Sequence, residues 1–328
     1  MKAVWPVVFL GLSAAHVALA ESADSQEGLT WLSKMAGASN QLNYSGTFVY
    51  QQRGRSETSR IVHFVNPAGG VFEKLETLDG PVREVIRSND QVTCYLPSSK
   101  TVLIEQRSAR LLPALLPENL TGITESYAVR VGERDRVAGQ ECQIVSLEPK
   151  DDLRYGRQFC LEVRSGLPLR VRTVNEKNET VESFAFTQLR IGGSFDRDRV
   201  KSKYAARSRH WRVDRSALNA TEKAVESGWV VNNQPAGFRK LMEVNRSLAG
   251  RGGPVAQIVF SDGLAAISVF IEPMPKERPA ETLTHQGAVN IYTRAYADRM
   301  VTVLGEAPAA TVMQFANSLE LRTSAAAK

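Results

Sequence analysis

The feature that most constrains the fold of this chain is a series of short segments in which apolar and polar residues alternate. Turn-forming pairs such as Asp79-Gly80 and Asn89-Asp90 divide these segments at close, even intervals. A period of two is typical of β-strands, and tight turns join antiparallel neighbours. Because strands do not alternate with long helices, a doubly wound nucleotide-binding fold is disfavoured. The expected strands of this first series are 44–52, 60–65, 71–78, 82–88, 91–96 and 101–106.

A second series of expected strands follows a Leu-rich segment, 110–122, that prolines interrupt. With the first series it gives ten or eleven strands, and so many strands seldom remain an open, flat sheet. The sequence therefore predicts a mainly β first domain with a large curled antiparallel sheet. A helix over 24–41 precedes this sheet, with Asp24 and Glu27 spaced as a capping box. The strands of the second series are 127–131, 141–148, 158–164, 169–174 and 181–191.

The first twenty residues have the pattern of a secretory signal peptide. Lys2 precedes an apolar run over residues 3–12, and Ala18-Leu19-Ala20 provides small residues at a cleavage site. A permanent anchor would need about 20 apolar residues, so we expect cleavage after Ala20 and a protein that is not integral to the membrane. Export argues against nucleic acid as a partner, and it lets thiols oxidise.

Positive charge is concentrated in one part of the chain. The chain has 41 Lys and Arg against 35 Asp and Glu, a net charge of +6, and eight basic and two acidic residues fall within 197–215. Such a run is usually a solvated connector, but it also suits an acidic protein segment or lipid phosphates. Its candidate contact residues are Arg207, Arg209, Trp211 and Arg212. We therefore divide the chain into a signal peptide (1–20), a first domain (21–200), a basic linker (201–218) and a second domain (219–328).

The second domain combines strands and helices. A short helix is expected over 220–226, and Pro308 opens a final helix that extends to about residue 321. The segments between them alternate as strands do, which predicts a smaller α+β domain. The expected strands are 229–231, 239–244, 255–260, 265–271 and 288–304.

The three cysteines have different expected roles. Cys142 and Cys160 lie on successive strands, equidistant from a turn near Asp151, so they could face each other across the pair. In an oxidising compartment they are candidates for a disulfide, and two buried thiols are the alternative. Cys94 is left over, and its strand context favours a buried thiol.

No catalytic, metal or cofactor site can be assembled from motifs. The chain lacks the G-x-S-x-G, S-x-x-K and H-E-x-x-H patterns, and its glycine-rich stretch at 250–253 lacks the residues of a phosphate loop. The three histidines beyond the signal peptide are His63, His210 and His285, which are far apart in sequence. We therefore expect a binding protein without cofactors rather than an enzyme.

An apolar ligand cavity is one candidate binding site. Phe48, Tyr50 and Phe64 occupy alternating strand positions and could face the Leu-rich segment, which would then act as a lid. The candidate lid residues are Leu112, Leu115 and Leu116. A closed hydrophobic core accounts for the same pattern, so the sequence pattern alone leaves both interpretations open.

Five strings of residues follow one another over nearly the whole chain beyond residue 20. They are 44–50 (YSGTFVY), 165–170 (SGLPLR), 228–231 (GWVV) ahead of 235–238 (PAGF), 260–264 (FSDGL) before 267–272 (ISVFIE), and 301–306 (VTVLGE). In this order they resemble the RseB/MucB family of sigma-E regulatory proteins. Each string is weak alone, but five in register across two domains are specific.

The resemblance implies a periplasmic regulator without enzymatic activity. Members bind the periplasmic part of a single-pass anti-sigma factor and protect it from the site-1 protease. Their large domain is an unclosed barrel similar to lipoprotein carriers, with an apolar cavity, and lipid or lipopolysaccharide is thought to displace the partner. A lipid or lipoprotein carrier is the alternative function, but a minimal carrier needs only one domain. The sequence is also compatible with a homo-oligomer.

Overall fold

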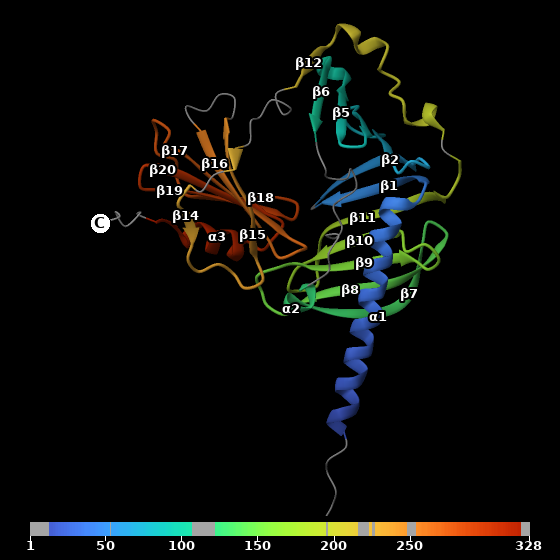
Figure 1. The fold of residues 1–328 in the computed structure, drawn as a ribbon, viewed down its shortest axis with the longest axis horizontal. Coiled ribbons are helices and arrows are strands. Elements are labelled where there is room, and N and C mark those ends of the chain that lie inside the picture. The colour runs from blue at the N-terminus through green and yellow to red at the C-terminus, as the bar shows by residue number, and fades with distance from the viewer. Residues whose placement is uncertain are drawn as a thin grey trace, which may run out of the picture.

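The computed structural model describes residues 13–52, 54–106, 122–194, 196–215, 223–224, 227–247 and 254–322. Over these residues two antiparallel sheets dominate, each with its own hydrophobic core (Figure 1). The predicted fold class, a large curled sheet followed by a smaller α+β domain, is confirmed.

The first sheet has twelve strands. All neighbouring pairs are antiparallel except β12 and β6, which run parallel at one edge. The alternation in the sequence located eleven of these strands, nine of them to within two residues at each end, but the predictions omit the last six residues of β7 and the first five of β2. In spatial order the strands are β12 (Arg212–Asp214), β6 (Thr101–Gln106), β5 (Gln91–Leu96), β4 (Glu84–Ser88), β3 (Val71–Thr77), β2 (Arg55–Val65), β1 (Tyr44–Gln52), β11 (Thr180–Ile191), β10 (Pro168–Val174), β9 (Gly156–Glu162), β8 (Gln140–Pro149) and β7 (Tyr127–Val137).

Helix α1 (Ser13–Gln41) packs on one face of this sheet, which we call the inner face; the opposite face is the outer face. Leu32 and Met35 are fully buried there against the core. The helix begins before the predicted start at Asp24, whose carboxylate accepts a hydrogen bond from the Val131 N–H at 3.0 Å. The predicted capping box is therefore wrong, because Asp24 lies inside the helix. Cleavage after residue 20 stays a prediction.

The second domain is built on a seven-stranded sheet. Helix α3 (Ala309–Asn317) packs on it through Val312 and Phe315. The remaining helix of the described residues, α2 (Ile123–Ser126), belongs to the first domain and is a single turn that precedes β7. The sheet order is β13 (Lys223–Ala224), β15 (Arg239–Ser247), β16 (Pro254–Ser261), β17 (Ala266–Pro273), β20 (Arg299–Gly305), β19 (Val289–Tyr296) and β18 (Thr282–Gln286), and β14 (Trp229–Val231) pairs separately with β21 (Leu319–Leu321).

Three predictions for the second domain are wrong in detail. Lys223 and Ala224 pair with β15 as a strand, so they are not helical. The single strand predicted over 288–304 is a hairpin, β19 and β20, which turns near Ala297 at a φ of 49°. The last helix ends at Asn317 because the following residues pair with β14.

The basic segment is folded onto the first sheet. Two 3-10 turns, η2 (Arg197–Val200) and η3 (Arg207–His210), lead into the edge strand β12. Val200 is buried against Val62 and Phe64 on the outer face. Residues 197–214 are therefore attached to the first sheet, although most of their side chains are exposed, and the boundary between the domains stays a prediction.

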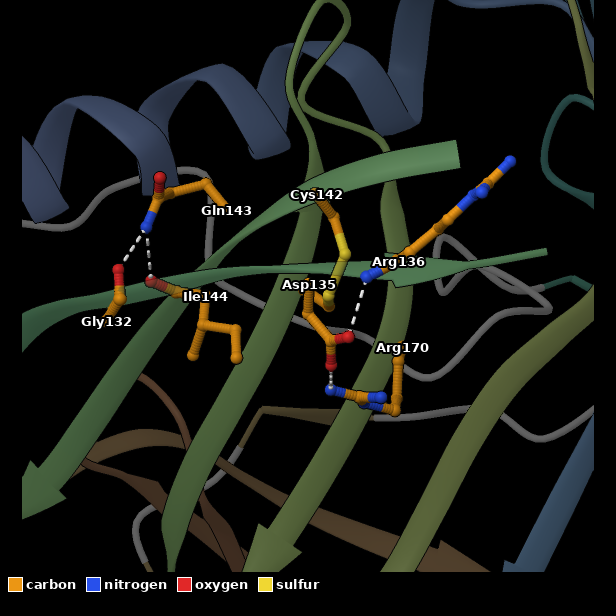
Figure 2. Close-up of a disulfide and its surroundings, with 8 residues drawn as sticks. Gly132, Asp135, Arg136, Cys142, Gln143, Ile144 and Arg170 are labelled. Carbon is orange, nitrogen blue, oxygen red and sulfur yellow. Dashed lines mark hydrogen bonds and ion pairs between the residues drawn. A yellow bond between two sulfur atoms is a disulfide. The ribbon is translucent and has the colours of Figure 1, made fainter. Parts of the chain in front are cut away.

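Cys142 and Cys160 form a disulfide on the outer face, with Cα atoms 5.3 Å apart (Figure 2). The expected register, with Cys142 directly opposite Cys160, is wrong by two residues: Cys142 lies opposite Glu162, and Cys160 lies opposite Ile144, so the bridge is diagonal. An ion pair of 2.6 Å between Asp135 and Arg170 joins the two strands that flank the disulfide. Four strands, β7 to β10, are thereby tied together. Cys94, expected as a buried thiol, is half-buried.

Candidate functional site

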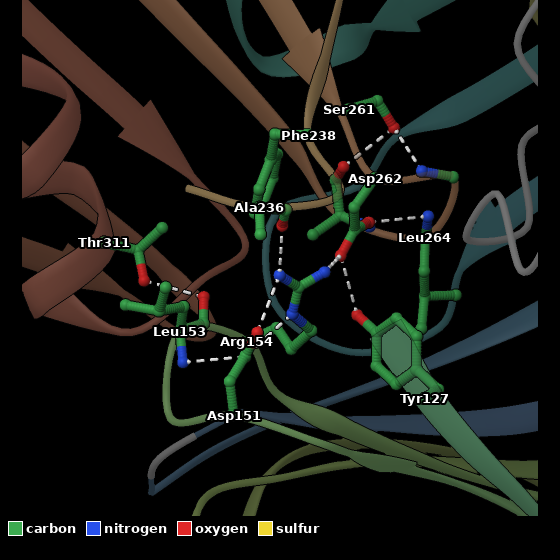
Figure 3. A network of polar contacts seen from close by, with 12 residues as sticks. Tyr127, Asp151, Leu153, Arg154, Ala236, Phe238, Ser261, Asp262, Leu264 and Thr311 are labelled. Carbon is green, nitrogen blue, oxygen red and sulfur yellow. Dashed lines mark hydrogen bonds and ion pairs between the residues drawn. The ribbon is translucent and has the colours of Figure 1, made fainter. Parts of the chain in front are cut away.

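The two domains meet at a buried polar interface, which we call the domain seam (Figure 3). The turn between β8 and β9 inserts Arg154 against the second domain, and the arginine side chain has no exposed surface. Its Nη1 donates to Asp262 at 2.8 Å, and its Nη2 donates to the Ala236 carbonyl at 2.6 Å. The residues of the seam are Tyr127, Leu153, Arg154, Tyr155 and Arg157 of the first domain, and Ala236, Asp262, Asn290, Glu306 and Thr311 of the second.

Arg154 is held from its own side as well. Asp151 accepts hydrogen bonds from Nε and Nη2, both at 2.9 Å, while the Tyr127 and Phe238 rings lie 5.7 and 5.2 Å from the guanidinium carbon. A planar guanidinium with two carboxylates and a carbonyl is a well-satisfied buried cation. The turn carrying Arg154 thus fixes the second domain by hydrogen bonds as well as by packing.

Tyr127 completes this cluster. Its hydroxyl donates to Asp262 at 3.0 Å. Burial, and next the negative charge of Asp262, raise the pKa of the Tyr127 phenol well above its ordinary value. The phenol therefore stays protonated at neutral pH and remains a hydrogen-bond donor across the seam.

A second polar chain crosses the seam from the inner face. The Tyr50 hydroxyl donates to Glu182 at 2.6 Å, Glu182 pairs with Arg157 at 3.4 Å, and Arg157 pairs with Glu306 of the second domain. Burial, then the hydrogen bond to Glu182, raise the pKa of Tyr50. Tyr50, which the sequence suggested as a cavity residue, is therefore linked to the second domain through Glu182 and Arg157.

Single hydrogen bonds extend the seam along the same turn. The Thr311 hydroxyl donates to the Leu153 carbonyl at 2.7 Å, and the Asn290 amide donates to the Tyr155 hydroxyl at 3.0 Å. Gly237 has a φ of +82°, and a Cβ there would lie 2.3 Å from Ser126 Oγ. The close approach therefore requires glycine at this position.

The residues predicted to line an apolar cavity do not share one face. Phe48 is buried on the inner face against Phe184 and Phe186. Tyr44 lies opposite His63, so the next residue, Phe64, points to the outer face. Grouping Phe64 with Phe48 and Tyr50 is therefore wrong. The predicted lid residues Leu112, Leu115 and Leu116 lie outside the described residues.

The predicted contact residues of the basic segment lie together at one edge of the first sheet. Arg207 and Arg209 are exposed on η3, and the Arg212 side chain is exposed on β12. Trp211 is half-buried, with its ring 5.8 Å from that of Tyr204. The cluster is a basic surface held in place by the sheet rather than a mobile arm.

The described residues contain no group of three or more His, Cys, Asp or Glu side chains that could hold a metal ion. Of the histidines, His63 is buried, with Nδ1 2.8 Å from the Leu42 carbonyl and its ring stacked on Tyr44. In the same part of the chain, no helix is long and apolar enough to cross a membrane.

The seam was not found from the sequence. Arg154 stands in a charged turn beside Asp151 and Asp152, which resembles an ordinary solvated loop. Its main partner, Asp262, is 108 residues away. The one available signal was the FSDGL string at 260–264, which contains Asp262 but does not name its partner.

Comparison with known proteins identifies the class as sigma factor regulatory proteins. The chain is 32% identical over 332 residues to the sigma factor AlgU regulatory protein MucB of Pseudomonas aeruginosa, and the match covers all of both chains. It is 23% identical to the sigma-E factor regulatory protein RseB of Escherichia coli K12, over 98% of each chain.

This chain belongs to the MucB/RseB family. Residues 27–204 match the family's N-terminal domain, and residues 223–320 match its C-terminal domain. Among solved structures, the MucA/MucB complex of Pseudomonas aeruginosa contains a chain with a TM-score of 0.73 and 28% identity, covering 91% of this chain and all of that one. A structure of MucB alone gives a TM-score of 0.62 over the same share of this chain.

Proposed function

We propose that this protein is a periplasmic negative regulator of the envelope stress response. In this proposal it binds the periplasmic region of a transmembrane anti-sigma factor and protects that region from site-1 proteolysis. The observation that carries the proposal is the similarity, over both domains, to MucB in its complex with MucA. Its role is to bind and shield, without catalysis.

The domain seam supports binding by both domains together. Arg154 and Arg157 tie the first domain to Asp262 and Glu306 of the second. A partner that touches both domains then meets one preformed surface and need not order it, which reduces the entropic cost of binding. Over 91% of this chain, the TM-score to MucB in the complex, 0.73, is also higher than the TM-score to MucB alone, 0.62.

The location and the domain division belong to the same proposal. Residues 1–20 direct export and are removed, residues 21–200 form the lipoprotein-carrier-like domain, and residues 219–328 form the smaller domain that contributes to partner binding. In this proposal the basic segment, with Arg207, Arg209, Trp211 and Arg212, contacts the partner or an anionic ligand. Lipid or lipopolysaccharide binding near Leu112, Leu115 and Leu116 releases the partner.

Protease protection tests this function. The purified protein, residues 21–328, is mixed with the periplasmic region of a MucA-type anti-sigma factor, and cleavage by the site-1 protease is followed over time. We expect cleavage to slow in proportion to the fraction bound and to recover when lipopolysaccharide is added. Cleavage at full speed with the partner saturated contradicts the shielding role, and unchanged protection across a wide lipid range contradicts the release.

A further inference from the structure

A basic groove of about 340 Å³ lies on the outer face of the first sheet, apart from the seam and from η3. Its floor is formed by three neighbouring strands, β2, β1 and β11, and η2 contributes one wall. Its polar lining comprises Ser45, Thr47, Arg60, Gln188, Arg190 and Arg199.

The strand register explains why these side chains meet. Thr47 lies opposite Arg60 on β2 and opposite Gln188 on β11. Ser45, two residues earlier, lies opposite Arg190 on β11. Because positions directly across a sheet share a face, two hydroxyls stand in the middle of the floor with an arginine on each flanking strand. Neighbouring strands are about 4.8 Å apart, so both arginine side chains can reach over the hydroxyls.

Arg199 adds a third cation from above the sheet. Its guanidinium carbon lies 5.6 Å from the Phe64 ring, and the next residue, Val200, is buried against Val62 and Phe64. Packing therefore holds η2 in place at the groove. A guanidinium over a ring keeps its N–H donors in its own plane, where they can still serve an anion.

The charge of the groove is one-sided. Among the residues that the structure describes, three arginines line it and no acidic residue does. Arg60 makes an ion pair with Glu76, but at 3.5 Å and with 56% of the arginine side chain exposed, so this contact compensates little of the charge. Guanidinium forks beside hydroxyl donors are the groups that recognise a tetrahedral oxyanion.

We propose that the groove binds a phosphate group, with Arg60, Arg190 and Arg199 pairing with its oxygens and the Ser45 and Thr47 hydroxyls donating to it. The shared chemistry is a phosphomonoester, carried either by a soluble molecule or by a lipid headgroup. The site does not depend on the proposed function, because it lies on the face opposite to Arg157, which pairs with Glu306 of the second domain.

Two probes separate the sources of the phosphate. Titration calorimetry with glycerol 3-phosphate measures a soluble ligand, and flotation with phosphatidylcholine vesicles containing phosphatidic acid measures a lipid headgroup. We expect saturable binding in at least one arm, and R60Q/R190Q lowers the affinity by about tenfold or more in that arm. Arg190→Lys keeps the charge but loses the fork, so we expect a smaller loss.

The charge-matched control is K276Q/R278Q, which removes two exposed cations from the second domain. It should change the affinity less than twofold, about the effect of diffuse surface charge. The proposal is overturned by the absence of saturable binding with both probes, or by equal losses in the two double variants. Binding in only one arm supports the site and identifies the source of its ligand.

Discussion

One ion pair of the domain seam and one ion pair of the basic segment lie at opposite degrees of burial. Arg154 and Asp262 pair with both side chains fully buried. Lys203 pairs with Glu76 while 49% of the lysine side chain is exposed. Of these two ion pairs, desolvation makes the Arg154–Asp262 pair decisive, and water screens the Lys203–Glu76 pair.

The comparison shows that the contacts must be weighed by burial and not by number. Removing one partner of a buried pair leaves an uncompensated charge, which costs about 3–5 kcal/mol, while an exposed pair is worth about 0–1 kcal/mol. The seam therefore fixes the relative placement of the domains, and the exposed ion pairs of the basic segment contribute little to stability.

The largest expected effect comes from the seam. Arg154→Met should lower the free energy of unfolding by about 3–5 kcal/mol, because Asp262 and Asp151 lose their buried cation. Chemical denaturation measures the change, and Asp262→Asn, which keeps the shape, should also destabilise. A loss of less than about 1 kcal/mol in the free energy of unfolding for Arg154→Met would contradict this, because the buried pair would then contribute no more than the exposed Lys203–Glu76 pair.

The disulfide separates stability from domain placement. C142A/C160A should cost about 2–4 kcal/mol, because the bridge closes a loop with a sequence separation of 18. Both cysteines lie within the first domain, so we expect unchanged affinity for the anti-sigma segment under conditions where the variant is folded. A loss of affinity matching that of Arg154→Met would show that the seam has no special role in placing the domains.

A smaller effect is expected from a single hydrogen bond in the seam. Thr311→Val keeps the side-chain volume but removes the donor to the Leu153 carbonyl, and should cost about 1–2 kcal/mol. Thr187→Val, which removes an exposed hydroxyl bonded to the Thr47 carbonyl, is the matched control. Equal losses for the two variants would contradict the weight given to burial.

The smallest effect concerns the exposed pair and depends on pH. The hydrogen bond from Lys203 is the largest influence that lowers the pKa of Glu76 below its ordinary value of 4.5. The folded state therefore binds a proton at Glu76 less readily than the unfolded state does. The stabilisation is fully present above the ordinary pKa and is lost as the pH falls through the lowered pKa of the folded state.

Lys203→Met should accordingly cost at most about 1 kcal/mol at neutral pH, and the cost should shrink towards zero as the pH falls through the lowered pKa of Glu76. Urea denaturation of both proteins from pH 7 downwards measures the difference. A cost that grows on acidification would reverse the sign required by the lowered pKa.

What the sequence could predict follows from the range of each interaction. Alternation and turns are local, so they located eleven strands of the first sheet, and the family strings identified the family. The face and the register of each strand depend on the exact length of the turns, which the sequence pattern does not give. The predicted face of Phe64 and the predicted partner of Cys142 are wrong for this reason. Arg154 and Asp262 become neighbours only after both domains fold, so no local pattern joins them.

That the seam holds the two domains as one binding surface is tested most directly by the affinity for the periplasmic region of a MucA-type anti-sigma factor. Titration calorimetry measures this affinity for the wild type and for Arg154→Met, at a temperature below the unfolding transition of the variant. We expect saturable binding by the wild type. The affinity of the variant should be about tenfold or more lower, because the two domains of the variant are no longer held as one surface. Absence of binding by the wild type would contradict the proposed function, and equal affinities would contradict the role of the seam.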